Sequence, residues 1–400
     1  MENDVQWYYG YILTKLASKK EKEYIQLEDK HSPLVNKPLD VVLTKGHGVW
    51  VYDIKGKKYL DLLAGFSALN QGHRHPEIVK SLKRQADRLT LTTRTFRNSQ
   101  LPLLLKDIHK IFGYKNIIVT NTGGEAVDTA VKIAKNWAEK NRNIPLDKVK
   151  IITFQNGYHA SNKVDKGKKD SIVLPYGDIE AVEKTLKKEP VGAIMVEPIQ
   201  GSTVEVPPKG FLSKLHKLAK KHKVLFIADE IQTGLGRTGK LLAIHHEGIK
   251  KPDMILLGKS LSGGVYPVSA VLTKKNVTMK GYGSTFGGNP LGSATARTAL
   301  KVLIKEKLPE RAQKLGDYFM EKLREIAKDS PYIKNIDGKG LLIGIKLTDK
   351  AYSVDIQKKL AKEGVLVGRG YQMLRISPPL IIKKQEIDHA LDKFKKVLAK

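Results

Sequence analysis

Short apolar runs alternate with amphipathic segments through the middle of the chain, from about residue 116 to residue 272. The apolar runs predict buried strands, and the segments between them, with apolar residues at helical spacing, predict helices. This alternation favours an α/β fold in which helices cover both faces of a mainly parallel sheet. The predicted strands are 116–120, 150–154, 192–198, 224–230, 254–258 and 269–273, and the clearest helices between them are 125–140 and 212–222.

The two ends of the chain have a different pattern. Residues 48–63 predict a hairpin that turns at 54–58, and long helical patterns with short strands in 338–347 and 373–382 follow residue 290. We expect these ends to fold together as a smaller α+β domain. The expected division is an amino-terminal segment that contributes to the small domain, a large α/β domain and a carboxyl-terminal small-domain part, at 1–65, 66–292 and 293–400.

Composition narrows the class of protein. With 41% hydrophobic and 28% charged residues the chain is typical of globular proteins, and its apolar runs are far too short to cross a bilayer. It opens without the basic and then apolar pattern of a secretory signal, so we expect a cytoplasmic protein. Cysteine is absent, which excludes disulfides and thiolate metal sites. The absence is typical of a thermophile, and also of a lysine-rich genome.

The net charge of +30 raises the question of a nucleic-acid partner. The lysines are spread along helical patterns over the whole chain, and no basic tail or aromatic-basic ladder accompanies them. We therefore expect no dedicated nucleic-acid function and no membrane partner. We expect instead that the charge favours anionic ligands.

Polar residues follow three of the predicted strands, at the sheet edge where α/β proteins bind ligands. Gly123 and Gly124 stand between a strand and a helix, where they form either a simple turn or a phosphate cradle. Asp229 ends an apolar strand, where a carboxylate needs a cationic partner or caps a helix, and Gln232 follows it. Lys259 follows another strand, and lysine is rarely buried without a partner. A phosphate cradle, an acid for a pyridine nitrogen and a lysine for an aldehyde together suggest pyridoxal 5'-phosphate.

The motifs around these residues resemble the ornithine aminotransferases, which are class III, fold type I enzymes that depend on pyridoxal phosphate. The resemblance covers about residue 38 to the carboxyl end, with the motifs in the same order and Lys259 thirty positions after Asp229. It implies that the chain transfers the δ-amino group of L-ornithine to 2-oxoglutarate by a ping-pong mechanism, as a homodimer or higher homo-oligomer. The motifs are GFSALNQGHRHPEIVKSL, LTLTTRTFRN, IVTNTGGEAVDTAVKIAKNWA, MVEPIQG, VLFIADEIQTGLGRTG, LLGKSLSGGVYPVSAVL, GSTFGGNPLG and LRISPPLII.

The resemblance also implies roles for the residues of the cofactor site. Lys259 would be the catalytic lysine, linked to the cofactor and later moving the proton between substrate and cofactor carbons. Asp229 would pair with the pyridinium nitrogen, and Gln232 would lie near the phenolic oxygen. Gly123 and Gly124 would hold the phosphate.

Three further positions follow from the same resemblance. Tyr158 would stack on the cofactor ring, and Thr285 would reach the phosphate from the other subunit of a dimer. Arg375 would bind a substrate carboxylate, a task for which the bidentate guanidinium is suited.

The chain departs from the family around the substrate. After Tyr158 the family continues Gly-Arg-Thr and a long loop, whereas this chain has Ala-Ser-Asn at 160–162 and a shorter loop, so that Ser161 replaces the arginine. The family's glutamate after the EPIQG motif is Ser202 here, and a pocket tyrosine is Phe66.

These departures predict a change in substrate binding. Without the masking glutamate, Arg375 should take an α-carboxylate in both half-reactions. Without the arginine, ornithine loses an anchor that is worth roughly 1.5–3 kcal/mol, unless Lys163 or Lys166 replaces it. The family's amino-terminal pocket motif is also altered, because it reads NKPLD from Asn36.

Three hypotheses therefore stand side by side. The first is a pyridoxal-phosphate aminotransferase of the ornithine type. The second keeps the cofactor and changes the reaction, to transamination of another ω-amino compound or to racemisation of an amino acid. The third is a non-catalytic paralogue, against which the retained Lys259 argues. His73 and His75 do not predict a metal site, because no third ligand has a suggestive spacing.

Overall fold

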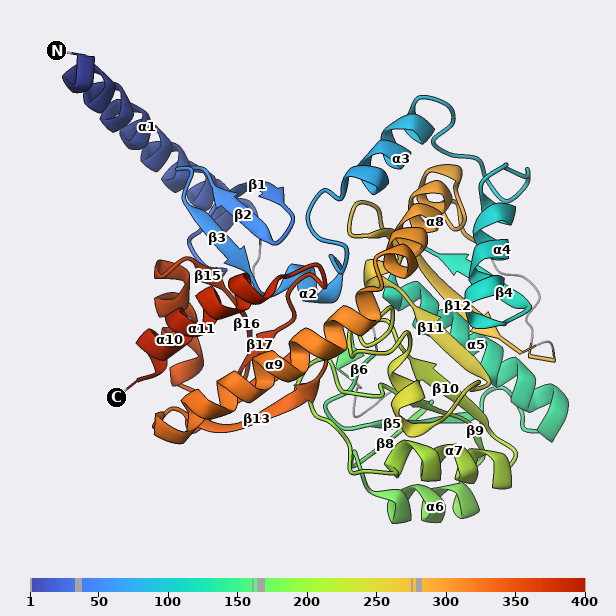
Figure 1. Cartoon of the computed structure of the whole chain (residues 1–400). Helices are drawn as coiled ribbons and strands as arrows, with labels where there is room; N and C mark the ends of the chain where they lie inside the picture. Colours follow the sequence, from blue (N-terminus) through green and yellow to red (C-terminus); the bar gives the residue numbers. More distant parts are fainter. Residues whose placement is uncertain are drawn as a thin grey trace.

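The computed structural model describes residues 2–32, 38–159, 162–163, 170–274, 276–277 and 283–399, with side chains for all of these except 2–15 and 162–163. Figure 1 shows a larger part built around one wide sheet and a smaller part in which the two ends of the chain lie together. The predicted α/β fold is confirmed. In the described residues, no helix is both long and apolar enough to span a membrane.

A seven-stranded sheet forms the centre of the larger part (Figure 1). The prediction of a mainly parallel sheet is confirmed, but one predicted strand, 269–273, runs antiparallel to both of its neighbours. The limits of the six predicted strands agree with the structure within two residues. The strands lie in the order β4 (Asn116–Thr120), β12 (Ser269–Thr273), β11 (Met254–Leu257), β10 (Leu225–Asp229), β9 (Val191–Val196), β5 (Lys150–Phe154) and β8 (Ser171–Leu174).

Both faces of this sheet are buried, because helices cover each of them. Successive residues of a strand point to opposite faces. Accordingly, Ile194 of β9 belongs to one hydrophobic core and its neighbour Met195 to a second core, which is built against α5. The helices of this part are α3 (Pro76–Ala86), α4 (Leu101–Phe112), α5 (Gly123–Arg142), α6 (Ile179–Lys188), α7 (Phe211–Lys221) and α8 (Pro290–Lys305), with the short 3-10 helices η1 (Ala243–Glu247) and η2 (Lys259–Ser262).

Two four-stranded sheets form the smaller part. The predicted hairpin is confirmed, since β2 and β3 pair antiparallel, and β3 also pairs in parallel with β15 from the other end of the chain. Helices α9 (Leu308–Asp329), α10 (Tyr352–Lys362) and α11 (Lys384–Leu398) pack against these sheets. One sheet has the order β1 (Leu43–His47), β2 (Trp50–Asp53), β3 (Lys58–Asp61) and β15 (Val365–Leu366), and the other β13 (Ile333–Lys339), β14 (Leu342–Leu347), β17 (Met373–Ile376) and β16 (Gly368–Gly370).

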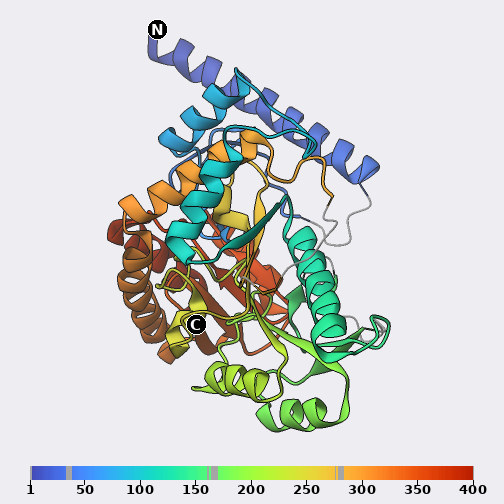
Figure 2. The same ribbon diagram turned by 90° about the vertical axis from the view of Figure 1, so that its right-hand side faces the viewer.

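The first helix, α1 (Glu2–His31), was not predicted. It projects from the body beside the β1–β3 sheet in Figure 1 and crosses the top of the molecule in Figure 2. Toward its carboxyl end the side chain of Glu21 is buried and accepts a hydrogen bond from Lys55 Nζ at 2.6 Å. This ion pair ties the helix to the β2–β3 turn.

Candidate active site

The carboxyl ends of the parallel strands bring the predicted cofactor residues to one edge of the central sheet. Asp229 is the last residue of β10, and Lys259 follows β11 as the first residue of η2. Gly123 opens α5 just beyond β4, and Tyr158 begins the short strand β6 (Tyr158–His159) beyond β5. This is the edge at which open α/β sheets bind their ligands.

Lys259 is held by Gln232. Its Nζ donates a hydrogen bond to Gln232 Oε1 at 2.8 Å. Burial lowers the pKa of Lys259 to about 8, although the carboxylates of Glu197 and Asp229 act to raise it. Its backbone lies in the left-handed region, at φ 45°, which costs a non-glycine residue about 1–2 kcal/mol. The fold therefore holds an amine of lowered basicity in a fixed place.

Asp229 forms a buried pair with His159. Oδ2 of Asp229 lies 2.8 Å from His159 Nδ1, and only 3% and 6% of the two side chains is exposed. Burial acts to lower the pKa of His159, but the hydrogen bond and charge of Asp229 outweigh burial, so that the pKa is raised. The imidazole thus holds the carboxylate of Asp229 in place at the end of β10. Sequence reasoning missed His159. The only feature of the sequence that could have indicated it is its position next to Tyr158.

Glu197 connects several parts of the site and was also missed. Its Oε2 accepts the backbone N–H of Tyr158 at 2.8 Å, and its Oε1 accepts that of Gly201 at 3.0 Å. Burial raises the pKa of this carboxyl group. A Cβ atom at Gly201 would lie 2.3 Å from Gln232 Oε1, so a larger residue there would displace the amide of Gln232. The available signal was the one used for Asp229, an acid that follows an apolar strand.

Arg375, on β17, reaches the same place from the smaller part. Its Nη1 donates to the carbonyl oxygen of Gly201 at 3.0 Å, and its guanidinium carbon lies 4.5 Å from the ring centre of Phe66. Its Nε is buried without a hydrogen-bond partner in the described part of the chain, and burial lowers its pKa. The hydroxyl of Ser202 donates to the carbonyl oxygen of Asn156 at 2.5 Å. Because its Nε has no partner, the guanidinium of Arg375 can still donate a hydrogen bond to a ligand.

Phe66 lies in an unusual turn. It belongs to α2 (Ala64–Ser67), in which every residue has a positive φ, and Asp61 Oδ1 accepts the N–H of Leu63 and of Ala64 before the turn. The ring of Phe66 is 42% exposed. The turn therefore presents an aromatic face toward the guanidinium.

The first turn of α5 has the geometry expected of a phosphate cradle. Thr122 caps the helix, since its side chain accepts the N–H of Glu125 at 3.2 Å. A Cβ atom at Gly123 would lie 3.3 Å from Ile231, a residue that sequence reasoning did not identify. The N-terminus of this 20-residue helix favours an anion.

The structure does not bring every predicted residue into this cluster. Tyr158 lies beside the cluster, with its backbone N–H bonded to Glu197, but 52% of the residue is exposed. Thr285 is exposed, and no hydrogen bond among the described residues joins it to Lys259 or Asp229. Asn36, Ser161, Lys166 and the side chain of Lys163 lie outside the described residues.

The two histidines of the GHRHP motif have carboxylate partners. His73 Nε2 lies 2.7 Å from Asp61 Oδ2, and His75 Nε2 lies 3.0 Å from Glu306 Oε1. In the described ranges, no three histidine, aspartate or glutamate side chains gather as a metal site would require.

The donor set fits pyridoxal phosphate. An amine of lowered pKa, a buried carboxylate and a capped helix N-terminus lie at one sheet edge, where they match the aldehyde, the ring nitrogen and the phosphate of that cofactor. The bound cofactor supplies an electron sink for the carbon that loses a proton. With the cofactor bound, Asp229 would hold a positive charge at the ring nitrogen, and Lys259 Nζ would take up and return the proton.

Known proteins resemble this chain over nearly its whole length. Residues 32–165 and 160–398 match the family described as aminotransferase class-III. An ornithine aminotransferase of Geobacillus sp. (strain WCH70) is 43% identical over an alignment of 400 residues, which covers 95% of this chain and 99% of that protein. The chain therefore belongs to the class-III aminotransferases, a family of enzymes that depend on pyridoxal phosphate.

Solved structures agree in fold. The acetylornithine aminotransferase of Elizabethkingia anophelis superposes with a TM-score of 0.89 at 42% identity, over 94% of this chain and 98% of that one. An ornithine aminotransferase of Toxoplasma gondii, crystallised with oxidised glutathione and with partial occupancy of pyridoxal phosphate at its active site, gives 0.90 at 39% identity over 94% of both chains. These similarities confirm the fold type, the cofactor and the enzyme class predicted from the sequence. Amino donors and 2-oxo acid acceptors are therefore the substrates.

Proposed function

We propose that this aminotransferase takes the δ-amino group of L-ornithine and passes it to 2-oxoglutarate. The proposal rests on a chain of contacts that joins the amine of Lys259 to the guanidinium of Arg375, a group suited to bind a carboxylate. Lys259 bonds to Gln232, whose oxygen packs on Gly201, and the carbonyl oxygen of Gly201 accepts a hydrogen bond from Arg375. The site thus offers an amine and a guanidinium to one substrate that carries both an amino and a carboxylate group.

In this proposal each residue acts through what it contacts. Lys259 is the catalytic base, since its pKa of about 8 suits proton transfer near neutral pH. Asp229, paired with His159, holds the ring nitrogen of the cofactor, and Gly123 and Gly124 bind its phosphate. The exposed ring of Tyr158 stacks on the cofactor.

Arg375 binds the carboxylate of the 2-oxo acid and Phe66 lines the same pocket. Since residue 202 is serine rather than the family's glutamate, no carboxylate from that position competes for the guanidinium of Arg375. The hydroxyl of Ser202 donates instead to the carbonyl oxygen of Asn156. A second candidate donor is acetylornithine, because it is the substrate in the name of the E. anophelis relative, which is 42% identical to this chain. The two donors differ in the group on the α-nitrogen and present the same δ-amine.

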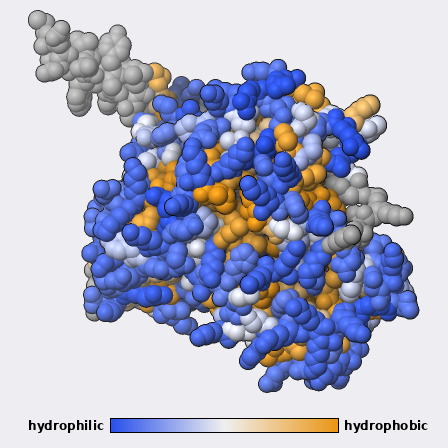
Figure 3. Space-filling model, turned by 45° about the vertical axis from the view of Figure 1, so that its right-hand side comes forward, coloured by the Kyte–Doolittle hydropathy of each residue, from blue (hydrophilic) through white to orange (hydrophobic). Residues whose placement is uncertain are grey.

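We further infer that the active unit is a homodimer. Figure 3 shows hydrophobic residues gathered in the centre of one face and bordered by hydrophilic ones. Large apolar side chains are exposed around the segment that bears Thr285, since Phe286 is 48% and Phe96 71% exposed. A second copy that covered them would remove apolar area from water.

We also keep the prediction of a cytoplasmic location.

The first experiment is to record the absorbance of the purified holoenzyme while L-ornithine is added. We expect the band of the lysine-linked cofactor to fall and to return with 2-oxoglutarate, with glutamate formed in equal amount. A response to N-acetylornithine alone would favour the second donor. A band that no amine changes would contradict catalysis and favour the non-catalytic paralogue. A band that changes without glutamate formation would contradict transamination of ornithine and leave racemisation in its place.

A further inference from the structure

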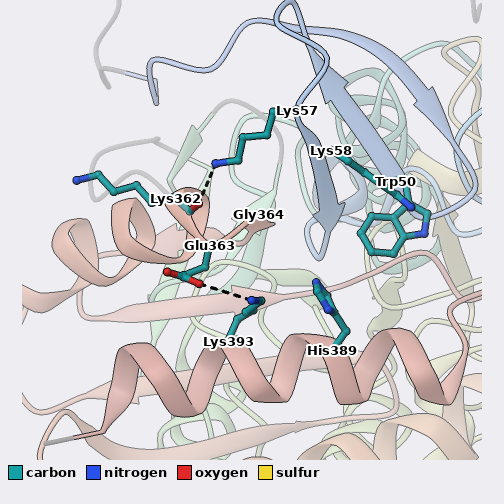
Figure 4. Close-up of a pocket in the computed structure, with 8 residues that line it drawn as sticks. All are labelled: Trp50, Lys57, Lys58, Lys362, Glu363, Gly364, His389 and Lys393. Atoms are coloured by element: carbon teal, nitrogen blue, oxygen red, sulfur yellow. Dashed lines mark hydrogen bonds and ion pairs between the residues drawn. The ribbon is translucent and has the colours of Figure 1, made fainter. Parts of the chain in front are cut away.

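A pocket lies in the smaller part of the molecule, where both ends of the chain meet (Figure 4). It has a volume of about 410 Å³ and is bordered by the β2–β3 hairpin, the junction of α10 with β15, and α11. None of its lining residues belongs to the site around Lys259. Its volume lies within the range of small-molecule sites, about 300–1,000 Å³.

The walls of this pocket carry an excess of positive charge. Lys57, Lys58, Lys362 and Lys393 line it, and Glu363 is the one acidic residue among the lining residues. Lys393 Nζ lies 3.6 Å from a carboxylate oxygen of Glu363, whose other oxygen already binds Lys396 at 2.7 Å. The carboxylate is thus shared between two ammonium groups and leaves the pocket positive.

The charges are positioned by the fold. Lys57 Nζ donates to the backbone oxygens of Ala361 and Lys362, at 3.3 and 2.8 Å, and so neutralises the negative end of α10. Lys362 extends from the rim in Figure 4, and its amine has no hydrogen bond or ion pair within the described residues. The partial negative charge at the end of α10 is therefore compensated by Lys57, and the amine of Lys362 at the rim stays available to a ligand.

An aromatic wall faces the lysines. Trp50 is fixed by a hydrogen bond from its Nε1 to Glu386 Oε1 at 3.1 Å, and its ring lies 6.0 Å from that of His389. Lys58 Nζ lies 3.8 Å from the centre of the Trp50 ring. This contact holds an ammonium at the wall, and the N–H groups that point away from the ring can donate to an anion.

We propose that this pocket binds a small anion with two or more phosphate charges. Ammonium groups from opposite walls act as point charges that suit the tetrahedral phosphate. Planar carboxylates are matched instead by the guanidinium fork, and no arginine is among the described residues that line the pocket. Such an anion relieves the repulsion between neighbouring lysines. It bridges the β2–β3 hairpin and α11, which come from the two ends of the chain.

The test is calorimetric titration of the holoenzyme, saturated with pyridoxal phosphate, with pyrophosphate. Saturation with cofactor keeps the probe out of the phosphate site of α5. We expect saturable binding that weakens by at least about tenfold in the double variant Lys58→Gln/Lys393→Gln, as loss of charge-assisted contacts requires. Citrate, whose charges are on planar carboxylates, should bind more weakly than pyrophosphate. Comparing the affinity for ATP with that for pyrophosphate shows whether an adenine base strengthens binding.

The matched control is Lys214→Gln/Lys217→Gln, which removes the same charge from the exposed face of α7. It should leave the affinity within about twofold. Both double variants should keep the cofactor absorbance, which shows that they fold. Equal weakening in the two variants, unchanged affinity in the first, or no saturable heat for the wild-type holoenzyme would each overturn the proposal.

Discussion

Lys259 shows how one residue is prepared by its neighbours. A lysine in water has a pKa near 10.4, so at pH 7.5 only about a thousandth of it is unprotonated. With its pKa lowered to about 8, roughly a quarter is the free amine at that pH. Burial dominates this shift over the opposing carboxylates of Glu197 and Asp229. The same desolvation that makes the lysine costly to bury makes it reactive.

The pH dependence of cofactor capture tests this reasoning. The amine must be unprotonated to attack the aldehyde, so the rate at which the apoenzyme binds pyridoxal phosphate should rise about tenfold per pH unit up to pH 8 and level off above it. The growth of the cofactor absorbance band after mixing measures this rate. A rate that continued to rise toward pH 10, or one independent of pH, would contradict the lowered pKa.

At the residue scale, the sequence identified groups that stand at the ends of their own strands. Asp229, Lys259 and the glycine turn were found because a polar residue after an apolar run is conspicuous. His159 was not found, because its meaning depends on Asp229, seventy positions away. Gly201 has no chemistry of its own and matters because its missing side chain leaves room for Gln232.

At the scale of elements, one arginine joins the two parts of the molecule. Arg237 follows β10 and is fully buried, and burial lowers its pKa to about 9. Its guanidinium donates to the backbone oxygens of Leu341 and Pro378, at 2.9 and 2.6 Å, and to Asn70 Oδ1 at 2.5 Å. Pro378 follows β17, the strand of Arg375, so the Arg237 side chain fixes the arginine that we propose for substrate binding relative to the central sheet.

Replacing Arg237 should therefore cost stability. In Arg237→Met three buried acceptors lose their donor, and we expect the free energy of unfolding to fall by about 2–5 kcal/mol. Denaturant unfolding followed by cofactor absorbance and by circular dichroism measures the change. The matched control is Arg311→Met. Arg311, on α9, also donates to backbone carbonyl oxygens, those of Ile381 and Ile382, but it is only half-buried. Equal losses in the two variants would contradict a special role for Arg237.

The elements that were predicted are those whose pattern is local. The strands of the central sheet are apolar on both faces, so a short apolar run is sufficient to identify them. Strand β8 was missed, because its residues are only half-buried at the edge of the sheet. Helix α1 lacks a clear apolar stripe, and the left-handed turn of α2 depends on contacts rather than on propensity. Neither leaves a periodic signal in the sequence.

At the scale of the whole molecule, Thr285 separates two arrangements of the active unit. It is exposed in the single chain, and the apolar side chain of Phe286 beside it is exposed as well. If a partner covers this segment, the hydroxyl of Thr285 reaches the phosphate in the partner's site. If not, Thr285 serves only its own chain.

Mixing two defective variants distinguishes these arrangements. Lys259→Ala removes the proposed catalytic amine, and Thr285→Ala should weaken the proposed hold on the phosphate. Each variant alone should therefore be poorly active when pyridoxal phosphate is limiting. In a hybrid dimer, the site with an intact Lys259 would receive an intact Thr285 from the partner, and equal mixing with exchange of subunits should restore about a quarter of the wild-type activity. If Thr285 acted within its own chain, no hybrid would contain an intact site, and the mixture would show only the average of its two parents.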